Sequence, residues 1–285
     1  MADYTLTQES TMTEHHFETP RPVRLLAEIG KGSVKIEATD TTQTHVEVRG
    51  RDAEQTLVRQ DGDQVSVIGP KQRGGFFGGD SRLDVVVTLP AASDLVVRTG
   101  SADIMVSGTV ATTQLKSGSG DVEVDTADGP LVVETGSGDV RIESARADLK
   151  AKSGSGDVLV VDAAAAVLVS TGSGDVQLWN TRGTAVVKTG SGDLKVGEAE
   201  GDVALTTGSG DLVVTRAHRG RVTVKGASGD VAIGIPAGVP VWTDIATVAG
   251  EIRSSLSGTG QPREGADHVE VRAKTVSGDI HLTEA

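Results

Sequence analysis

The sequence predicts an all-β protein: a right-handed parallel β-solenoid with 18-residue rungs and two short strands in each rung. The tetrapeptide Gly-Ser-Gly-Asp starts at positions 118, 136, 154, 172, 190 and 208, and the variant Gly-Ser-Ala-Asp starts one period earlier at position 100. Between the copies, apolar and polar residues alternate. Aromatic residues are only 2% of the chain, so Val, Leu, Ile and Ala must fill a thin, regular core. A fixed period of this kind is typical of repeat architectures.

The first strand of each rung directly follows the aspartate. The first and third residues after the aspartate are apolar, whereas the residue between them varies freely. Alternation with a period of two indicates a strand that buries one face. The apolar pairs are Val122 and Val124, Val140 and Ile142, Val158 and Val160, Val176 and Leu178, Leu194 and Val196, and Leu212 and Val214.

A second strand lies about ten to twelve residues after each aspartate, where apolar residues again alternate. Its apolar pairs are Leu131 and Val133, Leu149 and Ala151, Val167 and Val169, Ala185 and Val187, and Val203 and Leu205. The corner between the strands often turns a small residue inward, as at Ala127, Ala145, Ala163, Ala199 and Ala217. The other corner holds the Gly-Ser-Gly-Asp motif, where we expect tight turns with positive φ at glycine. Stacking at about 4.8 Å would pair every strand in parallel with its neighbours.

The flanks fit the same rod less regularly. We expect residues 1–16 to be a disordered tail and residues 17–285 to be a single solenoid domain. Within that domain, residues 17–99 would form irregular capping rungs, residues 100–230 the regular rungs and residues 231–285 the closing rungs. Two loops are predicted, a flexible one at residues 70–81, which carries Phe76 and Phe77, and a polar one at residues 257–267.

Composition excludes several classes of function and location. A net charge of −13 argues against non-specific binding to nucleic acid, which requires clustered Lys and Arg. The absence of cysteine excludes disulfides and thiolate metal sites. The N-terminus has no basic segment followed by an apolar one, and the most apolar run, residues 158–170, is too short to span a bilayer. We therefore expect a soluble, cytoplasmic protein without a transmembrane segment.

Three segments together resemble the bacterial putative-adhesin domain family of GSGD-repeat β-solenoids. They are the run VVVTLPAASDLVVRTGSADIMVSG, the GSGDV array after it, and the terminal pair IPAGVPVW and VRAKTVSGDIHL. The resemblance covers nearly all of residues 17–285. It implies a β-solenoid with an adhesin-like label, in a family of largely unknown function. The family brings no catalytic residues to carry over.

The most regular chemical feature is an aspartate ladder, formed by Asp103, Asp121, Asp139, Asp157, Asp175, Asp193, Asp211 and Asp230. Carboxylates stacked about 4.8 Å apart repel by roughly 0.9 kcal/mol per pair in bulk water, so another interaction must offset that repulsion. One interpretation is a row of Ca²⁺ ions that bridge successive rungs. The favoured one is that each carboxylate accepts hydrogen bonds from corner amides and from the serines of the motif. Those serines are Ser119, Ser137, Ser155, Ser173, Ser191 and Ser209.

The other candidate residues, which are a ladder of hydroxyls, a tryptophan and a histidine pair, do not indicate a functional site. A ladder of hydroxyls, at Thr99, Ser117, Thr135, Ser153, Thr171, Thr189 and Thr207, supplies one hydroxyl rank where ice binding would need two, so we interpret it as sheet-stabilising. Trp179 occupies an outward strand position. His15 and His16 form the one histidine pair, and in a disordered tail they would not bind a metal. No Ser/His/Asp arrangement, P-loop or dinucleotide motif is present.

These observations favour a non-enzymatic scaffold that presents its ladders to a protein or cell-envelope partner, or to copies of itself through its ends. No catalytic, cofactor-binding or metal-binding residue is assigned. The first alternative is a Ca²⁺-stabilised binding module that uses the aspartate ladder. The second is a polysaccharide-active β-helix enzyme, which would require a cleft lined by convergent carboxylates.

Overall fold

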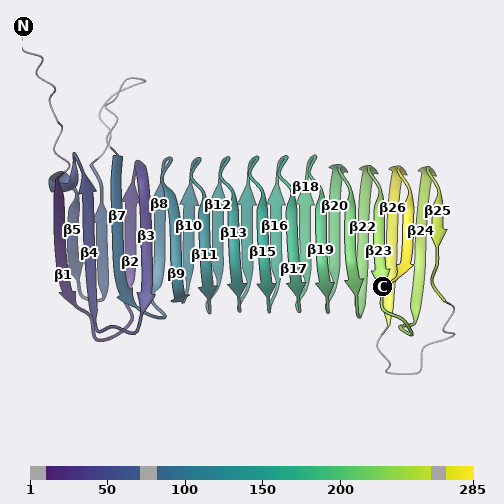
Figure 1. Ribbon diagram of the computed structural model, residues 1–285, viewed down its shortest axis with the longest axis horizontal. Coiled ribbons are helices and arrows are strands. Elements are labelled where there is room, and N and C mark those ends of the chain that lie inside the picture. Colours follow the sequence, from purple (N-terminus) through teal and green to yellow (C-terminus); the bar gives the residue numbers. More distant parts are fainter. Residues whose placement is uncertain (1–10, 71–81, 258–267) are drawn as a thin grey trace, which may run out of the picture.

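The computed structural model describes residues 11–70, 82–257 and 268–285. The protein is an elongated parallel β-solenoid with two long sheets, as the repeat predicts (Figure 1). The first-strand sheet contains the strands that follow the aspartates, in the order β1-β4-β7-β3-β9-β11-β13-β15-β17-β19-β21-β23-β27-β25. The second-strand sheet has the order β24-β26-β22-β20-β18-β16-β14-β12-β10-β8-β2-β6-β5. No described residue lies in a helix with the length and apolarity needed to cross a bilayer.

Successive strands of the regular rungs belong alternately to the two sheets, so that each rung contributes one strand to each sheet. Their strands are β8 (Asp94–Thr99), β9 (Asp103–Val110), β10 (Thr113–Ser117), β11 (Val122–Ala127), β12 (Leu131–Thr135), β13 (Val140–Ala145), β14 (Leu149–Ser153), β15 (Val158–Ala163), β16 (Val167–Thr171), β17 (Val176–Thr181), β18 (Ala185–Thr189), β19 (Leu194–Ala199), β20 (Val203–Ser209), β21 (Leu212–Ala217), β22 (Gly220–Ser228) and β23 (Val231–Ile235).

The apolar residues of successive rungs form continuous buried columns. Val122 pairs with Val140, Val140 with Val158, and Val158 with Val176, all in parallel register. None of these four side chains is more than 1% exposed. The small corner residues, such as Ala127 and the alanines in register with it, are also buried. Because each rung covers its neighbours' apolar face, the core is shared along the rod.

The N-terminal end does not continue the regular pattern. Its elements are β1 (Met12–Glu18), β2 (Arg24–Ile29), β3 (Lys31–Thr39), β4 (Gln43–Gly50), the 3₁₀ helix η1 (Ala53–Gln55), β5 (Leu57–Asp61), β6 (Gln64–Ile68) and β7 (Arg82–Pro90). β1 runs antiparallel to β4, β4 antiparallel to β7, and β5 antiparallel to β6. Ala53 in η1 is buried in the core at this end.

The prediction of a disordered tail over residues 1–16 was wrong where the structure describes it. Residues 12–16 lie in β1, which pairs with β4 along its whole length, from Met12 opposite Arg49 to Glu18 opposite Gln43. Phe17 packs against the core, so β1 has an apolar anchor that a disordered tail lacks. Residues 1–10 and most of the two predicted loops, at 71–81 and 258–267, lie outside the described residues.

The last two rungs stack in an order that differs from their order in the sequence. They comprise β24 (Val241–Ala249), β25 (Ile252–Ser254), β26 (Val269–Ser277) and β27 (Ile280–Glu284). The rung β26–β27 pairs directly with β22 and β23, and β24–β25 stacks on its outer side (Figure 1). The earlier segment in the chain therefore forms the terminal rung.

Glycine in the motif corner is required by close approach between rungs, not by positive φ as expected. Only Gly210, Gly229 and Gly278 of these corners have φ in the left-handed range, at 140°, 127° and 132°. A Cβ atom on Gly156 would lie 2.0 Å from the carbonyl oxygen of Gly138 in the preceding rung. A Cβ on Gly174 would lie 2.1 Å from that of Gly156. The corner backbones therefore stack at a separation that a side chain would prevent.

Candidate functional site

The aspartate ladder is a continuous chain of hydrogen bonds between rungs. In each rung, Oδ1 of the aspartate accepts a hydrogen bond from the backbone N–H of the next aspartate in the stack. The N–H of Asp121 donates to Asp103 over 3.0 Å, and that of Asp175 donates to Asp157 over 2.8 Å. The series continues through Asp211, Asp230 and Asp279 and ends where the N–H of Glu251 donates to Asp279.

These bonds supply the interaction that offsets repulsion between stacked carboxylates. Each exposed aspartate accepts a hydrogen bond from an amide that the corner geometry would otherwise leave to water. Hydrogen bonds to charged groups contribute about 1.5–3 kcal/mol, which exceeds the repulsion of one solvated neighbour. The predicted bond from corner amides is therefore present. Among the described residues, no hydrogen bond joins these aspartates to the motif serines Ser119, Ser137, Ser155, Ser173, Ser191 or Ser209.

The hydroxyl ladder lines the inside of the same corner. Oγ of Ser117 accepts a hydrogen bond from the N–H of Gly120 over 2.8 Å, and Oγ1 of Thr171 accepts one from Gly174 over 3.1 Å. The same bond forms from Gly138 to Thr135, from Gly156 to Ser153 and from Gly192 to Thr189. These side chains are buried, at most 8% exposed, so they cannot present an ice-binding face. Their role is to satisfy buried glycine amides from the core side.

An open groove of about 380 Å³ follows the outer face of the first-strand sheet. Four consecutive ladder aspartates, Asp121, Asp139, Asp157 and Asp175, form one side of it, and Leu159 lies among the other lining residues. Acid–base catalysis by a pair of carboxyl groups needs the two groups in different environments, so that one holds a proton and the other does not. The four ladder carboxylates instead occupy repeated, nearly identical environments. The groove therefore presents negative charge along the rod without the asymmetry of an acid–base pair.

Two glutamates that form ion pairs have lowered pKa values, Glu198 and Glu270. A hydrogen bond with His218, 2.7 Å long, does most to lower the pKa of Glu198, burial opposes it, and Arg216 lowers it further. The pKa of Glu270 is lowered mainly by its hydrogen bond with Arg221, and Arg272 adds to this. Because both pKa values are depressed, these pairs stabilise the fold at neutral pH and lose their contribution as the pH falls through the lowered pKa.

Trp179 faces outward, as its strand position predicts, and is 47% exposed. The Nζ atom of Lys195, on the neighbouring rung, lies 5.6 Å from the centroid of its ring. A cation–π contact at an exposed site contributes about 0.5–1 kcal/mol, so the indole has a structural partner on the rod itself. Trp242 on the terminal rung is 53% exposed and has the corresponding contact with Arg272, at 5.7 Å.

The two neighbouring histidines lie on opposite faces of β1. His15 points to the half-buried side beside Phe17, with ring centroids 6.5 Å apart, and His16 points outward and stacks on His45 of β4. Sequence reasoning placed both in a tail and did not single out His45. The signal that could have found His45 is the alternation of Gln43–Gly50, which places its side chain on the outer face of a strand.

The ladder bond predicts different effects for two substitutions of Asp157. Asp157→Ala removes the acceptor of the Asp175 amide and is expected to lower the free energy of unfolding by about 1 kcal/mol. Asp157→Asn keeps a side-chain oxygen at the acceptor position and removes one of a row of like charges. This variant should match the wild type or be slightly more stable. Urea denaturation of the three proteins measures both differences.

Melting curves of the EDTA-treated, dialysed protein with and without added CaCl₂ are the control for this prediction, because they test the calcium interpretation separately. We expect the curves of the wild type to superimpose, since Oδ1 of each ladder aspartate already has an amide partner. A Ca²⁺-dependent rise in melting temperature that Asp157→Asn reduces would contradict the hydrogen-bond account.

A family model described as Toastrack DUF4097 matches residues 27–185 and, a second time, residues 130–283. The two matches overlap and together cover most of the rod. No curated protein matches the chain significantly.

Several solved structures are similar to the chain at low identity. A putative lipid binding protein from Parabacteroides distasonis is 10% identical, with 95% of this chain and 96% of that chain covered and a TM-score of 0.46. A putative adhesin from Parabacteroides merdae is 11% identical, with 97% of each chain covered and a TM-score of 0.37. A putative adhesin from Bacteroides fragilis is also 11% identical, with 95% and 97% covered and a TM-score of 0.33. At such low TM-scores, none of them adds to the argument about fold or function.

Proposed function

The chain belongs to the Toastrack DUF4097 family, and we propose that it is a non-enzymatic binding scaffold whose terminal rung, β24–β25, binds another protein. In this proposal the regular rungs form a rigid spacer, and the partner attaches at the C-terminal end of the rod. The partner is a second copy of the chain.

The observation that carries the proposal is the exposure of a core position. Ile252 on β25 pairs with Ile280 on β27, which in turn pairs with Val231 on β23. Ile280 and Val231 are fully buried, whereas Ile252 in the same column is 46% exposed. The apolar core of the solenoid thus extends to the surface at this end. Burying an exposed column of this kind is the main driving force of most protein association.

The backbone at this end also has unpaired edges. β25 is the last strand of the first-strand sheet and β24 the last of the second-strand sheet, and each pairs with one strand only among the described residues. An open strand edge can pair with a strand from another chain. Trp242 and Val248 on β24 are 53% and 84% exposed and add apolar surface beside that edge.

The N-terminal end has different surfaces. Its outermost strands, β1 and β5, run antiparallel to their neighbours, and η1 contributes the buried Ala53 (Figure 1). Because β4 is antiparallel to both β1 and β7, β1 runs in the same direction as the regular first strands, whereas β5 runs opposite to the regular second strands. Stacking of one copy's C-terminal end on another's N-terminal end would therefore continue the parallel ladder in the first-strand sheet but not in the second-strand sheet. Two C-terminal ends related by a two-fold axis place each edge strand antiparallel to its own copy, which is a normal sheet pairing. A dimer joined tail to tail is the arrangement that these edges fit.

Sedimentation velocity over a range of concentrations tests the proposal. We expect the wild type to show a monomer–dimer equilibrium, and Ile252→Asp to be monomeric at the same concentrations because it places a charge in the joined core. Leu168→Asp is the matched control, since Leu168 is 41% exposed on the second-strand sheet in the middle of the rod. This variant should dimerise like the wild type.

A wild type that stays monomeric throughout, or a dimer that Leu168→Asp disrupts and Ile252→Asp does not, would rule out this surface. The alternative is calcium binding along the aspartate ladder, where Oδ1 of each carboxylate already accepts a hydrogen bond from an amide.

A further inference from the structure

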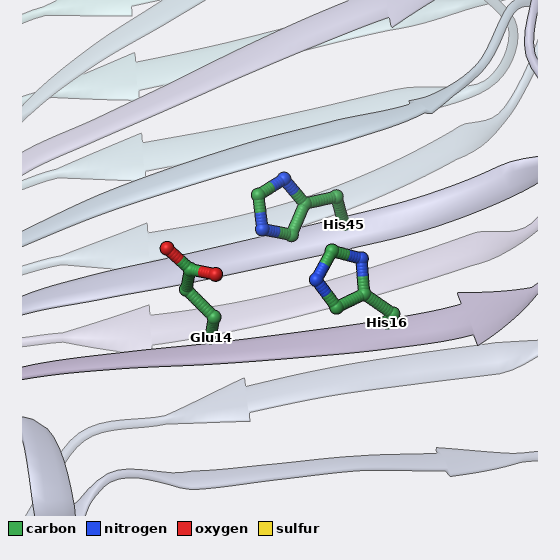
Figure 2. A group of neighbouring side chains, drawn as sticks. All are labelled: Glu14, His16 and His45. Atoms are coloured by element: carbon green, nitrogen blue, oxygen red, sulfur yellow. The ribbon is translucent and has the colours of Figure 1, made fainter.

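Three side chains that can bind a metal meet on the outer face of the N-terminal end. Glu14 and His16 lie on β1, and His45 lies on β4. Figure 2 shows one nitrogen of each imidazole and the carboxylate of Glu14 facing a common space. Their ligand atoms all lie within 4.8 Å of one another.

The strand pairing brings these residues together. His16 is directly opposite His45 in the antiparallel register, and Glu14, two residues earlier on β1, points to the same face of the sheet. The two imidazole rings are stacked, with centroids 4.3 Å apart and planes at 4°. Glu47, which lies opposite Glu14, is paired with Arg49, so its charge already has a partner.

One of the ligand atoms is buried without a hydrogen bond. Nε2 of His45 has almost no contact with solvent and no hydrogen-bond partner among the described residues. Leaving a buried polar atom unsatisfied costs about 1–3 kcal/mol, and native structures rarely keep one without a reason. A metal ion bound between the three side chains would satisfy this atom.

We propose that Glu14, His16 and His45 bind one divalent transition-metal ion of the zinc type, which fastens the edge strand β1 to β4. Two imidazole nitrogens and one carboxylate oxygen are a ligand set that Zn²⁺ accepts, with a further position left for water. Tetrahedral ligands about 2.0–2.1 Å from zinc are roughly 3.3 Å apart, so small side-chain rotations would close the observed group around an ion.

The ion would act as a clip at the end of the rod. β1 is the edge strand of the first-strand sheet, and Phe17 is its one hydrophobic side chain that packs against the core among the described residues. A metal that joins β1 to β4 closes the chain segment between them and holds the edge strand in place. This keeps the edge of β4 covered by β1.

Isothermal titration calorimetry of the EDTA-treated, dialysed full chain with ZnCl₂ tests the proposal. We expect one Zn²⁺ per chain, with the affinity reduced by on the order of tenfold or more in His16→Asn and in His45→Asn, because each loses a ligand. His15→Asn is the matched control: the same change one residue away, on the opposite face of β1. It should bind Zn²⁺ like the wild type.

Amide hydrogen exchange gives a second measurement on the same proteins. Zn²⁺ should slow the exchange of the β1 amides in the wild type and in His15→Asn, and have no such effect in His16→Asn. The proposal is overturned if the wild type does not bind Zn²⁺, or if binding persists unchanged in both His16→Asn and His45→Asn. Circular dichroism of each variant establishes that a loss of binding is not a loss of fold.

Discussion

Replacing Gly156 by alanine is expected to destabilise the protein by about 3 kcal/mol, which is the upper range for inserting a methyl group into a packed site. The new Cβ would lie 2.0 Å from the carbonyl oxygen of Gly138 and 2.5 Å from its carbonyl carbon. Both are backbone atoms held by the ladders on either side, so they cannot rotate away as a side chain can. The rungs would have to separate at this corner. Urea denaturation followed by circular dichroism measures the loss.

Gly226→Ala is the matched control. A Cβ on Gly226 would have Leu212 Cδ1 as its nearest neighbour, at 3.4 Å, which is ordinary van der Waals contact. Gly226 is also absent from the glycines with positive φ. We expect no loss of stability. The substitution reduces the entropy of the unfolded chain, which would stabilise the protein by some tenths of a kcal/mol. Equal losses at the two positions would show that close approach of the rungs is not the reason for glycine in the corner.

Replacing Leu178 by alanine is expected to cost about 3 kcal/mol, within the range for emptying a buried leucine site. Leu178 is 1% exposed and pairs with Val160 on one side and Val196 on the other, all in the same apolar column. The cavity would lie between two rungs whose backbones are fixed by parallel ladders, so the surroundings can relax little. The shift in the urea midpoint, with the slope unchanged, measures the cost.

Leu168→Ala makes the same chemical change on a neighbouring strand. Leu168 is 41% exposed on the outer face of β16, and we expect a change within about 0.5 kcal/mol. Similar effects at Leu178 and Leu168 would contradict the assignment of inner and outer faces on which the whole rod depends.

The regular rungs could be predicted because every position in them recurs with the same environment. The alternation after each aspartate placed Val140, Val158 and Val176 in one buried column, and the structure confirms it. The prediction needed only the period, because in a solenoid the contacts of one rung are those of the next. The same regularity located the aspartate ladder and its amide partners.

The ends could not be predicted, because their contacts do not repeat. The inward side of β1 has Thr13, His15 and Phe17, which carry too little apolar character to indicate a strand. Its antiparallel pairing with β4 became visible only with the fold. The two closing rungs have similar alternation, so local pattern did not reveal that β26–β27 stacks first and β24–β25 last.

Three features of the candidate sites also depend on contacts that the sequence alone does not show. Position 156 requires glycine because a carbonyl group of the preceding rung lies beside it, and only the stacked structure shows that close approach. The group of Glu14, His16 and His45 joins two strands through an antiparallel register that the sequence did not predict. The exposed end of the apolar column at Ile252 follows from the exchanged order of the last two rungs.

The distance between spin labels at Lys116 and Lys225 tests the central claim most directly. The chain has no cysteine, so Lys116→Cys and Lys225→Cys introduce the only labelling sites. The two positions lie in one outward column, connected through Glu134, Lys152, Ser170, Lys188 and Thr206. Six rung steps of about 4.8 Å place them about 29 Å apart. Double electron–electron resonance should give one narrow distribution near that distance, and a broad distribution or a mean far from it would contradict in-register stacking of the rungs.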